Sequence, residues 1–283
     1  MKLVRYGNPG KEKPGLLDAE GKLRDLSGVV KDIGPEQLSA DALARLSRQK
    51  TDKLPLVKGS PRMGCPINGV GKFIAIGLNY ADHAAESNLP VPAEPVVFMK
   101  ATTSISGPND DVMQPRSSTK LDWEVELAVV IGTTVRRAST KQAEEAIAGF
   151  SVLNDITCRD WQFRTREWLQ GKNWDSTTPV GPYLVTPDEL PGGVRPKVDV
   201  SLSVDGAVMQ SDNTGDLLFD PVYLVEYIST MIRLNPGDII ATGTPGGVGH
   251  ARKPEVYLHG GEFVVAEIAG IGALANHVRA DAS

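Results

Sequence analysis

The stretch LDWEVELAVVI, residues 121–131, places two glutamates in a largely apolar run that is suited to burial. Successive side chains of a β-strand point to opposite faces, so a strand here directs Glu124 and Glu126 to one face and their apolar neighbours to the other. The Ala-Val-Val-Ile that follows is apolar at every position, as in a strand covered on both faces. Two anions in so poor a solvent repel each other, and a shared proton or a bound cation relieves that repulsion. We favour a cation, bound at the mouth of a buried core.

Composition and charge argue against several classes of protein. The 283 residues are 41% hydrophobic and 23% charged, which suits one sizeable core with a small additional domain. A net charge of -5 and a sequence pI near 5.5 give no general attraction to nucleic acid or anionic membranes, and we expect neither as a partner. The first residues lack the apolar core of a signal peptide, so we expect a cytoplasmic protein. Cys65 and Cys158 have no paired spacing, which indicates two reduced thiols.

The chain divides near residue 68, where a connector rich in proline and glycine ends. Residues 1–68 predict a small N-terminal α+β domain, with a helix over residues 39–48. Residues 69–283 predict a β-rich α+β domain, because many short β-type runs alternate with turns and helical patterns are few. The β-type runs cover residues 72–76, 96–99, 125–131, 149–154, 182–186, 198–204, 238–242 and 262–268, and the helical patterns cover residues 80–87, 141–146 and 221–231.

A His–Glu pair follows the first strand of the larger domain, in the stretch GLNYADHAAE, residues 77–86. Asn79 is a good N-cap residue, and a helix that starts there places His83 and Glu86 on one face at i and i+3. A carboxylate beside an imidazole fixes its tautomer and raises its basicity, as a general base acting on water requires. A helix-surface pair of small energetic worth is the alternative that spacing alone leaves open.

A third carboxylate, Asp155, ends the strand-like run GFSVLND, residues 149–155. Together with Glu124 and Glu126 it makes three hard oxygen ligands with no clustered histidine or cysteine. Such a set suits Mg²⁺, or Mn²⁺, and is poorly suited to Zn²⁺. Solvated acids at strand ends remain the alternative, because acidic side chains are mostly exposed.

Polar residues that can hold an anionic substrate follow Asp155. Arg159 and Gln162 lie three residues apart, and Lys172 follows a glycine in a polar segment that contains tryptophan. An arginine and an amide donor suit an oxo acid, although surface solvation is the commoner fate of such residues. The stretch LNPGDIIATGTPGGVG, residues 234–249, lacks the phosphate-loop pattern, but Thr244 can meet a ligand there, with a plain turn as the alternative.

Six motifs occur in order along the chain: GLNYADHAAE, KATTSISGPND, LDWEVELAVVIG, GFSVLNDITCRDWQ, GKNWDSTTPVGPYLV and LNPGDIIATGTPGGVG. In this order, across residues 70–275, the sequence resembles the fumarylacetoacetate hydrolase family. The opening 27 residues and the stretch GPNDDV resemble the bacterial branch of that family that acts on diketo sugar acids. The resemblance implies a mixed β-sandwich roll, usually dimeric, so a homodimer is expected. It also implies Mg²⁺ held by Glu124, Glu126 and Asp155.

The same resemblance implies roles for the other candidate residues. His83 and Glu86 would be carried on a lid helix that orders when substrate binds, and Lys172 would act in catalysis. Arg159, Gln162 and Thr244 match substrate-binding positions of the family. One departure is that larger relatives supply a further aspartate ligand upstream, which this sequence does not match. The departure favours the small acylpyruvate-type enzymes over those that cleave fumarylacetoacetate.

The expected activity is magnesium-dependent hydrolysis of a carbon–carbon bond in a 2,4-dioxo acid, a small-molecule substrate. In this hypothesis His83 activates water for attack on C4, and the cation with Lys172 meets the charge of the departing enolate. A six-carbon 6-deoxy sugar acid would yield pyruvate and lactate. The alternative activity is decarboxylation of oxaloacetate or a related β-keto acid, which needs the same chelate but no activated water. A non-catalytic metal-dependent binding protein is the third possibility.

Overall fold

The strand that contains Glu126 and directly follows Glu124, β10 (Val125–Ile131), lies inside an eleven-stranded sheet in the computed structural model, which describes residues 1–281. Its main path runs β3 (Leu23–Asp25), β2 (Lys13–Leu17), β1 (Lys2–Tyr6), β13 (Thr178–Val185), β11 (Ile147–Asn154), β10, β16 (Ile239–Ala241), β5 (Phe73–Gly77) and β6 (Val96–Lys100). Off this path, β4 (Met63–Gly64) pairs with β1, and β7 (Ile105–Ser106) pairs with β13.

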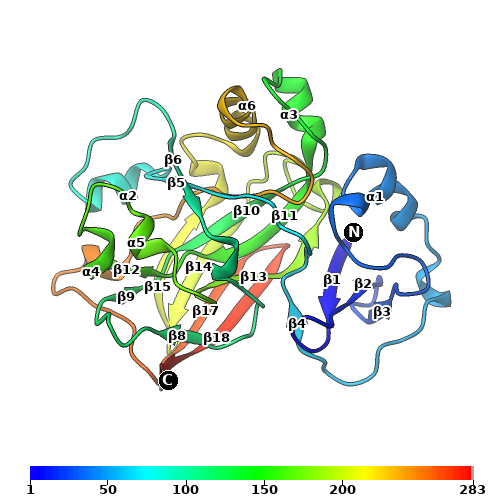
Figure 1. Cartoon of the computed structure of the whole chain (residues 1–283), viewed down its shortest axis with the longest axis horizontal. Helices are drawn as coiled ribbons and strands as arrows, with labels where there is room; N and C mark the ends of the chain where they lie inside the picture. Colours follow the sequence, from blue (N-terminus) through cyan, green and yellow to red (C-terminus); the bar gives the residue numbers. More distant parts are fainter. Residues whose placement is uncertain (282–283) are drawn as a thin grey trace.

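A second sheet of five strands packs against one face of the first (Figure 1). Its order is β15 (Ala207–Asn213), β14 (Asp199–Val204), β17 (Phe263–Ile268), β18 (Gly272–Ala280) and β8 (Val112–Gln114). A short pair, β9 (Leu121–Asp122) with β12 (Thr157–Cys158), lies beside the ends of β10 and β11. The helices are α1 (Ala40–Ser47), α2 (Ala81–Glu86), α3 (Thr140–Ala146), α4 (Arg159–Gln162), α5 (Leu169–Lys172) and α6 (Pro221–Met231). The β-rich sandwich predicted from the sequence is confirmed.

Side-chain alternation along β10 divides the interior into two cores, as the two-residue period predicts. Trp123, Val125 and Leu127 are buried in the larger core, which also contains the inner faces of β14 and β17 and the apolar faces of α3 and α6. Ala128 and Val130 face the other side and join a core with the N-terminal residues. Glu124 and Glu126 share the parity of that second side. The carboxylates therefore lie on the face of β10 opposite the sandwich core.

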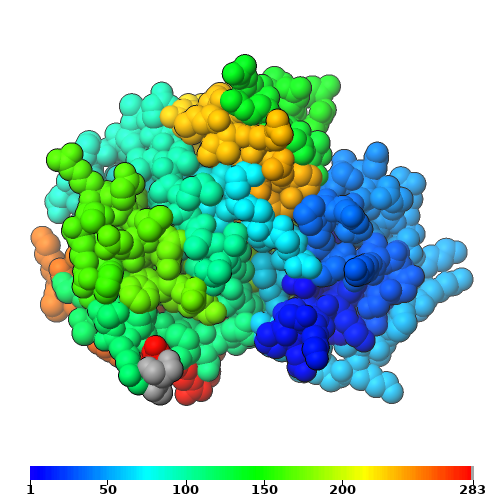
Figure 2. All heavy atoms as spheres, in the orientation of Figure 1, coloured from blue at the N-terminus to red at the C-terminus, as the bar shows by residue number. Residues whose placement is uncertain are grey.

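The N-terminal strands extend the large sheet, because β1 pairs antiparallel with β13. Figure 2 shows the N-terminal residues, in dark blue, at one side of the molecule. Their apolar side chains, including Leu3 and Leu16, pack in the second core against β13 and β16. The boundary near residue 68, with domains over residues 1–68 and 69–283, stays a prediction.

Most elements form where the sequence patterns predict them. The helix expected over residues 221–231 is α6, and its N-cap residue is Asp220, whose carboxylate accepts hydrogen bonds from the backbone N–H groups of Val222 and Tyr223. The patterns missed several strands, among them the long β18 and also β15, where polar residues occupy an edge strand and leave no buried alternation. None of the helices within residues 1–281 combines the length and apolarity needed to cross a bilayer.

A glycine within β11, Gly149, tests the close approach of β11 to β13. A Cβ on Gly149 would overlap the carbonyl oxygen of Val185, so Gly149→Ala must displace a buried strand. We expect this variant to lose about 1–3 kcal/mol of unfolding free energy, measured by guanidinium denaturation. Gly28→Ala is the control, because a Cβ there meets no atom within 4 Å. Equal stability of the two variants would contradict the close packing of these strands.

Candidate active site

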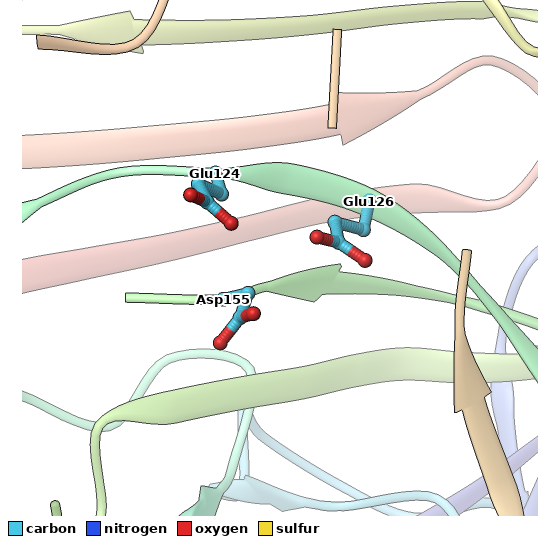
Figure 3. A group of neighbouring side chains, drawn as sticks. All are labelled: Glu124, Glu126 and Asp155. Carbon is cyan, nitrogen blue, oxygen red and sulfur yellow. The ribbon is translucent and has the colours of Figure 1, made fainter. Parts of the chain in front are cut away.

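Three carboxylates meet where β10 begins and β11 ends. Val125 pairs with Asn154 in the antiparallel register, so the residues just outside this pair, Glu124 and Asp155, lie side by side. The backbone N–H of Asp155 donates to the carbonyl of Glu124 at 2.8 Å, which continues the ladder by one residue. Figure 3 shows Glu124 and Glu126 along one strand, with their carboxylates on the side of Asp155, which lies at the end of the neighbouring strand. One oxygen from each lies within 4.8 Å of the others, and all three side chains are buried.

Three buried cations surround these carboxylates. The ammonium of Lys172 lies 2.5 Å from Glu124 Oε2 and 2.9 Å from Asp155 Oδ2. Lys100, the last residue of β6, donates to Asp155 Oδ1 at 2.5 Å and to the carbonyl of Lys172 at 2.5 Å. Arg159 Nη2 lies 2.8 Å from Glu124 Oε1. Glu124 and Asp155 are therefore held in a buried network of ion pairs.

The pKa values of the three carboxyl groups are shifted in different directions. Burial alone would raise the pKa of Asp155, but Lys100 and Lys172 together lower it. Burial is likewise outweighed at Glu124, where Lys172 and Arg159 lower the pKa. Glu126 has no such partner close by, and burial together with the charges of Asp155 and Glu124 raises its pKa well above the usual value. Glu126 is therefore the carboxylate whose ionisation most needs an additional positive charge.

The donor set fits a hard divalent cation. Glu126 Oε2 accepts a hydrogen bond from the backbone N–H of Gly243 at 2.7 Å, and within residues 1–281 no hydrogen bond is made to its Oε1. With Asp122, the site contains four buried carboxylates and three buried cations, which leaves one negative charge. A divalent ion would change that balance to one positive charge. Carboxylate oxygens without nitrogen or sulfur donors suit Mg²⁺ or Mn²⁺.

Neighbouring side chains hold the guanidinium of Arg159 in place without any substrate. Its Nε donates to Asp122 Oδ2 at 2.7 Å and its Nη1 donates to Gln162 Oε1 at 2.9 Å. Burial opposes the charged form, but Asp122 and Glu124 outweigh it and raise the pKa of Arg159, so the guanidinium stays charged. The sequence pairs Arg159 with Gln162 as a substrate clamp, and the structure brings them together at the start and end of α4.

The His83–Glu86 pair forms as predicted, but the predicted cap of its helix is wrong. His83 Nδ1 lies 2.8 Å from Glu86 Oε1, and both side chains line the same cavity as the carboxylates. The N-cap position of α2 is Tyr80, with no side-chain cap. Asn79 is fully buried and instead exchanges hydrogen bonds with the backbone of Phe219 and donates to the carbonyl of Thr242. Those buried backbone groups need partners, and this need outweighs the capping preference of asparagine.

The glycine-rich loop after β16 holds α2 in place. The backbone N–H of Gly246 donates to Asp82 Oδ2 at 2.9 Å, and that of Gly247 donates to Glu86 Oε2 at 2.7 Å. Glu86 is thus fixed through one oxygen and orients His83 through the other. Thr244 is buried in the same loop, and its hydroxyl accepts a hydrogen bond from Gln210 Nε2 at 2.7 Å.

A cavity of about 630 Å³ joins these groups. Most of the residues expected to act line it, namely His83, Glu86, Glu124, Glu126, Asp155, Arg159, Gln162 and Thr244. Lys172 does not line the cavity and reaches the site through its contacts with Glu124 and Asp155. Trp168 and Phe98 form an edge-to-face pair on the wall, with ring centroids 5.5 Å apart. An apolar wall next to buried charges lowers the effective dielectric constant, which strengthens electrostatic interactions inside the cavity.

Three further polar residues at the site were not predicted as site residues. Lys100 and Asp122 lie inside the motifs KATTSISGPND and LDWEVELAVVIG, but isolated charges at strand ends look like solvated residues until the fold buries them. His250 also lines the cavity. It follows the glycine-rich loop directly, which is the one signal in the sequence that could have indicated it.

The chain is similar to known proteins over nearly its whole length. Residues 72–279 match the family model described as fumarylacetoacetate (FAA) hydrolase C-terminal. A 2,4-didehydro-3-deoxy-L-rhamnonate hydrolase of Sphingomonas sp. is 49% identical over 274 residues, which are 96% of this chain and 94% of that protein.

Solved structures share the whole fold. A fumarylacetoacetate hydrolase from Exiguobacterium antarcticum is 34% identical with a TM-score of 0.85, over 99% of this chain and 100% of that one. A maleylpyruvate hydrolase from Sphingobium sp. SYK-6, in complex with manganese(II) ion and pyruvate, is 25% identical with a TM-score of 0.82, over 99% of each chain. The family model and the named relative define a hydrolase that acts on carbon–carbon bonds. The chain belongs to the fumarylacetoacetate hydrolase family.

Removal of one carboxylate charge tests the metal site. Glu126→Gln keeps the side-chain shape but removes an anionic ligand, and loss of even an outer-shell partner commonly costs 10–100-fold in affinity. We expect the dissociation constant of Mn²⁺, measured by titration calorimetry, to rise at least about tenfold. Glu167→Gln, an exposed acid between α4 and α5, should bind as the unchanged protein does. Unaltered affinity in Glu126→Gln would exclude Glu126 as a ligand.

Proposed function

We propose that the protein hydrolyses the C3–C4 bond of a 2,4-dioxo acid with the help of a divalent cation, and that its substrate is 2,4-didehydro-3-deoxy-L-rhamnonate. The observation that carries this proposal is one cavity lined by both a buried three-carboxylate set and a His–Glu dyad. The relative of that name, 49% identical over nearly the whole chain, supports the substrate. The pyruvate and manganese in the maleylpyruvate hydrolase structure support a cation and a three-carbon keto-acid product.

A cation held by Glu124, Glu126 and Asp155 would supply positive charge to polarise the 2-oxo group and to offset the charge of a leaving enolate. We propose Mg²⁺ as the resident ion, with Mn²⁺ able to replace it. Arg159 and Gln162 line the same cavity and can donate hydrogen bonds to the oxygen atoms of an anionic substrate. The buried charge balance favours such an anion, since the occupied site would carry one net positive charge.

His83 is arranged to remove a proton from water. Glu86 as a carboxylate can only accept hydrogen bonds, so His83 carries its proton on Nδ1 and leaves Nε2 as the basic nitrogen. Water adds its oxygen to C4 while His83 takes the proton, and the C3–C4 bond then breaks with its electron pair going to C3. The proton returned to C3 completes pyruvate, and C4 becomes the carboxylate of lactate. Lys172, 2.5 Å from Glu124, would stabilise the negative charge of the departing enolate.

The sequence also supports proposals about the setting of the reaction. We propose that the protein acts in the cytoplasm as a homodimer, in catabolism of a sugar acid. These proposals rest on the family to which the chain belongs and on its similarity to a rhamnonate hydrolase.

A panel of substrates tests the reaction itself. Purified protein with Mg²⁺ is offered 5-hydroxy-2,4-dioxohexanoate, 2,4-dioxopentanoate and oxaloacetate, and the products are identified by mass. We expect pyruvate and lactate from the first and pyruvate and acetate from the second. Release of carbon dioxide from oxaloacetate without cleavage of either dioxo acid would establish the decarboxylase alternative. Binding of these acids with no turnover would establish a binding protein.

Loss of His83 tests the general base. General acid–base catalysis contributes about 10²–10⁴-fold, so His83→Ala should lower kcat by that factor. Mn²⁺ binding should be unchanged, since the imidazole is not among the three carboxylate ligands. His259→Ala, an exposed histidine in another loop, should retain full kcat. Full hydrolysis by His83→Ala would overturn the assignment of the base.

A further inference from the structure

A chain of four polar side chains ends at the cavity in His250. His250 Nδ1 lies 2.7 Å from the hydroxyl of Tyr257, and that hydroxyl lies 2.7 Å from Glu255 Oε2. Lys120 donates to the same Glu255 oxygen at 2.9 Å. His250 lines the cavity together with the three carboxylates, and the ring of Phe163 lies against it with centroids 5.1 Å apart.

This chain fixes which nitrogen of His250 carries the proton. The hydrogen bonds from Tyr257 and Lys120 lower the pKa of Glu255, so its carboxylate can only accept. Tyr257 has one hydroxyl proton and donates it to Glu255; burial and this carboxylate raise its pKa to about 12, so the proton stays. The tyrosine oxygen must then accept from His250, which places the imidazole proton on Nδ1. Nε2 is left with a lone pair and makes no hydrogen bond within residues 1–281.

His250 is also kept neutral. Burial lowers its pKa, and the nearby guanidinium of Arg159 lowers it further, against the opposing effects of Glu255 and Asp122. Its backbone N–H donates to Asp122 Oδ2 at 3.0 Å, the same oxygen that accepts from Arg159 Nε. The Asp122 carboxylate therefore joins the backbone of His250 to the guanidinium of Arg159. Arg159 in turn contacts Glu124.

We propose that His250 is a specificity residue whose Nε2 accepts a hydrogen bond from a hydroxyl group on the substrate carbon beyond C4. The inference rests on the proposed function, since it assigns part of the same cavity. A neutral acceptor binds a hydroxyl donor but repels a carboxylate, which can only accept. The site would thus favour hydroxylated 2,4-dioxo acids over unsubstituted ones and over those with a second carboxylate.

Two cations near the same part of the cavity define the competing interpretation. Arg252 is committed to backbone acceptors, because its Nη2 donates to the carbonyls of Met209 and Gly247. Lys253 is exposed and lines the cavity, so it is the residue that would bind a second substrate carboxylate. If Lys253 rather than His250 sets specificity, the preferred substrate is a dicarboxylic acid.

A ratio of specificity constants tests the inference. The holoenzyme with saturating Mg²⁺ is assayed on 5-hydroxy-2,4-dioxohexanoate and on 2,4-dioxohexanoate, which differ only in the hydroxyl. A hydrogen bond whose loss leaves a polar group unpaired commonly changes kcat/KM about 10–100-fold, and the unchanged protein should favour the hydroxylated acid by that factor. His250→Phe keeps a ring against Phe163 but removes the acceptor, so the ratio should fall at least about tenfold. His250→Gln, whose amide oxygen can accept, should keep more of the preference than His250→Phe.

The matched control is Lys253→Met, which should leave the ratio within about twofold of that of the unchanged protein. A ratio that His250→Phe leaves unaltered, or one that only Lys253→Met changes, would overturn the inference while dioxo-acid hydrolysis stands. Failure of the unchanged protein to cleave either acid would instead defeat the proposed function.

The role of Tyr257 as a positioning residue has its own readout. Nitrogen-15 spectra of the four histidines, with the His250 signals assigned by their loss in His250→Phe, should show the proton of His250 on Nδ1. Tyr257→Phe removes the acceptor that holds this tautomer, so the spectra should show the proton shared between both nitrogens and the substrate preference should fall. A His250 proton on Nε2 in the unchanged protein would contradict the assignment directly.

Discussion

The mutual compensation of buried charges at the ends of β10 and β11 is the constraint on which the site depends. A buried carboxylate is tolerated only when cations and hydrogen-bond donors surround it, and here the cations come from distant parts of the chain. Lys100 ends β6, Arg159 begins α4 and Lys172 ends α5. The same ion pairs that make the carboxylates tolerable therefore fix the α4–α5 segment on the sheet. The carboxylates exceed the cations by one negative charge. The lack of a compensating positive charge is greatest at Glu126, as its raised pKa indicates.

The glycine-rich loop after β16 distributes backbone donors among the acids. The N–H groups of Gly243, Gly246, Gly247 and Gly249 donate to Glu126, Asp82, Glu86 and Asp122, respectively. Gly243 and Gly247 have φ values of 99° and 101°, a region that other residues rarely adopt. The loop thus connects Glu126 of the carboxylate cluster, the His–Glu dyad and Asp122, the partner of Arg159, through one short backbone segment. A shift of this loop would disturb all of these groups together.

The sequence predicts the sandwich and the acidic site because both follow from local periodicity. Alternation in residues 121–131 places Glu124 and Glu126 on one face, and the spacing of His83 and Glu86 brings their side chains together. The prediction fails where a residue's environment is set by distant segments. Asn79 has the local pattern of a cap but satisfies backbone groups 140 and 163 residues away, and Lys100 becomes a counter-ion only when β6 joins the sheet. The loop resembles a plain turn because its backbone donors carry no signature in side-chain pattern.

Local charge, rather than the net charge of -5, governs what the cavity can bind. Exposed acids on the surface are screened within about 8–10 Å at physiological salt, whereas groups inside a buried site interact with little screening. With a divalent ion present, the buried groups would carry one positive charge, which attracts the single carboxylate of a dioxo acid. A second carboxylate on the substrate would then have the exposed Lys253 as its cationic partner in the cavity. It would also have to lie near Nε2 of His250, a neutral acceptor that cannot donate to it. The charge balance at one end of the cavity and the fixed tautomer at His250 therefore select together for a monoanion that carries a hydroxyl group.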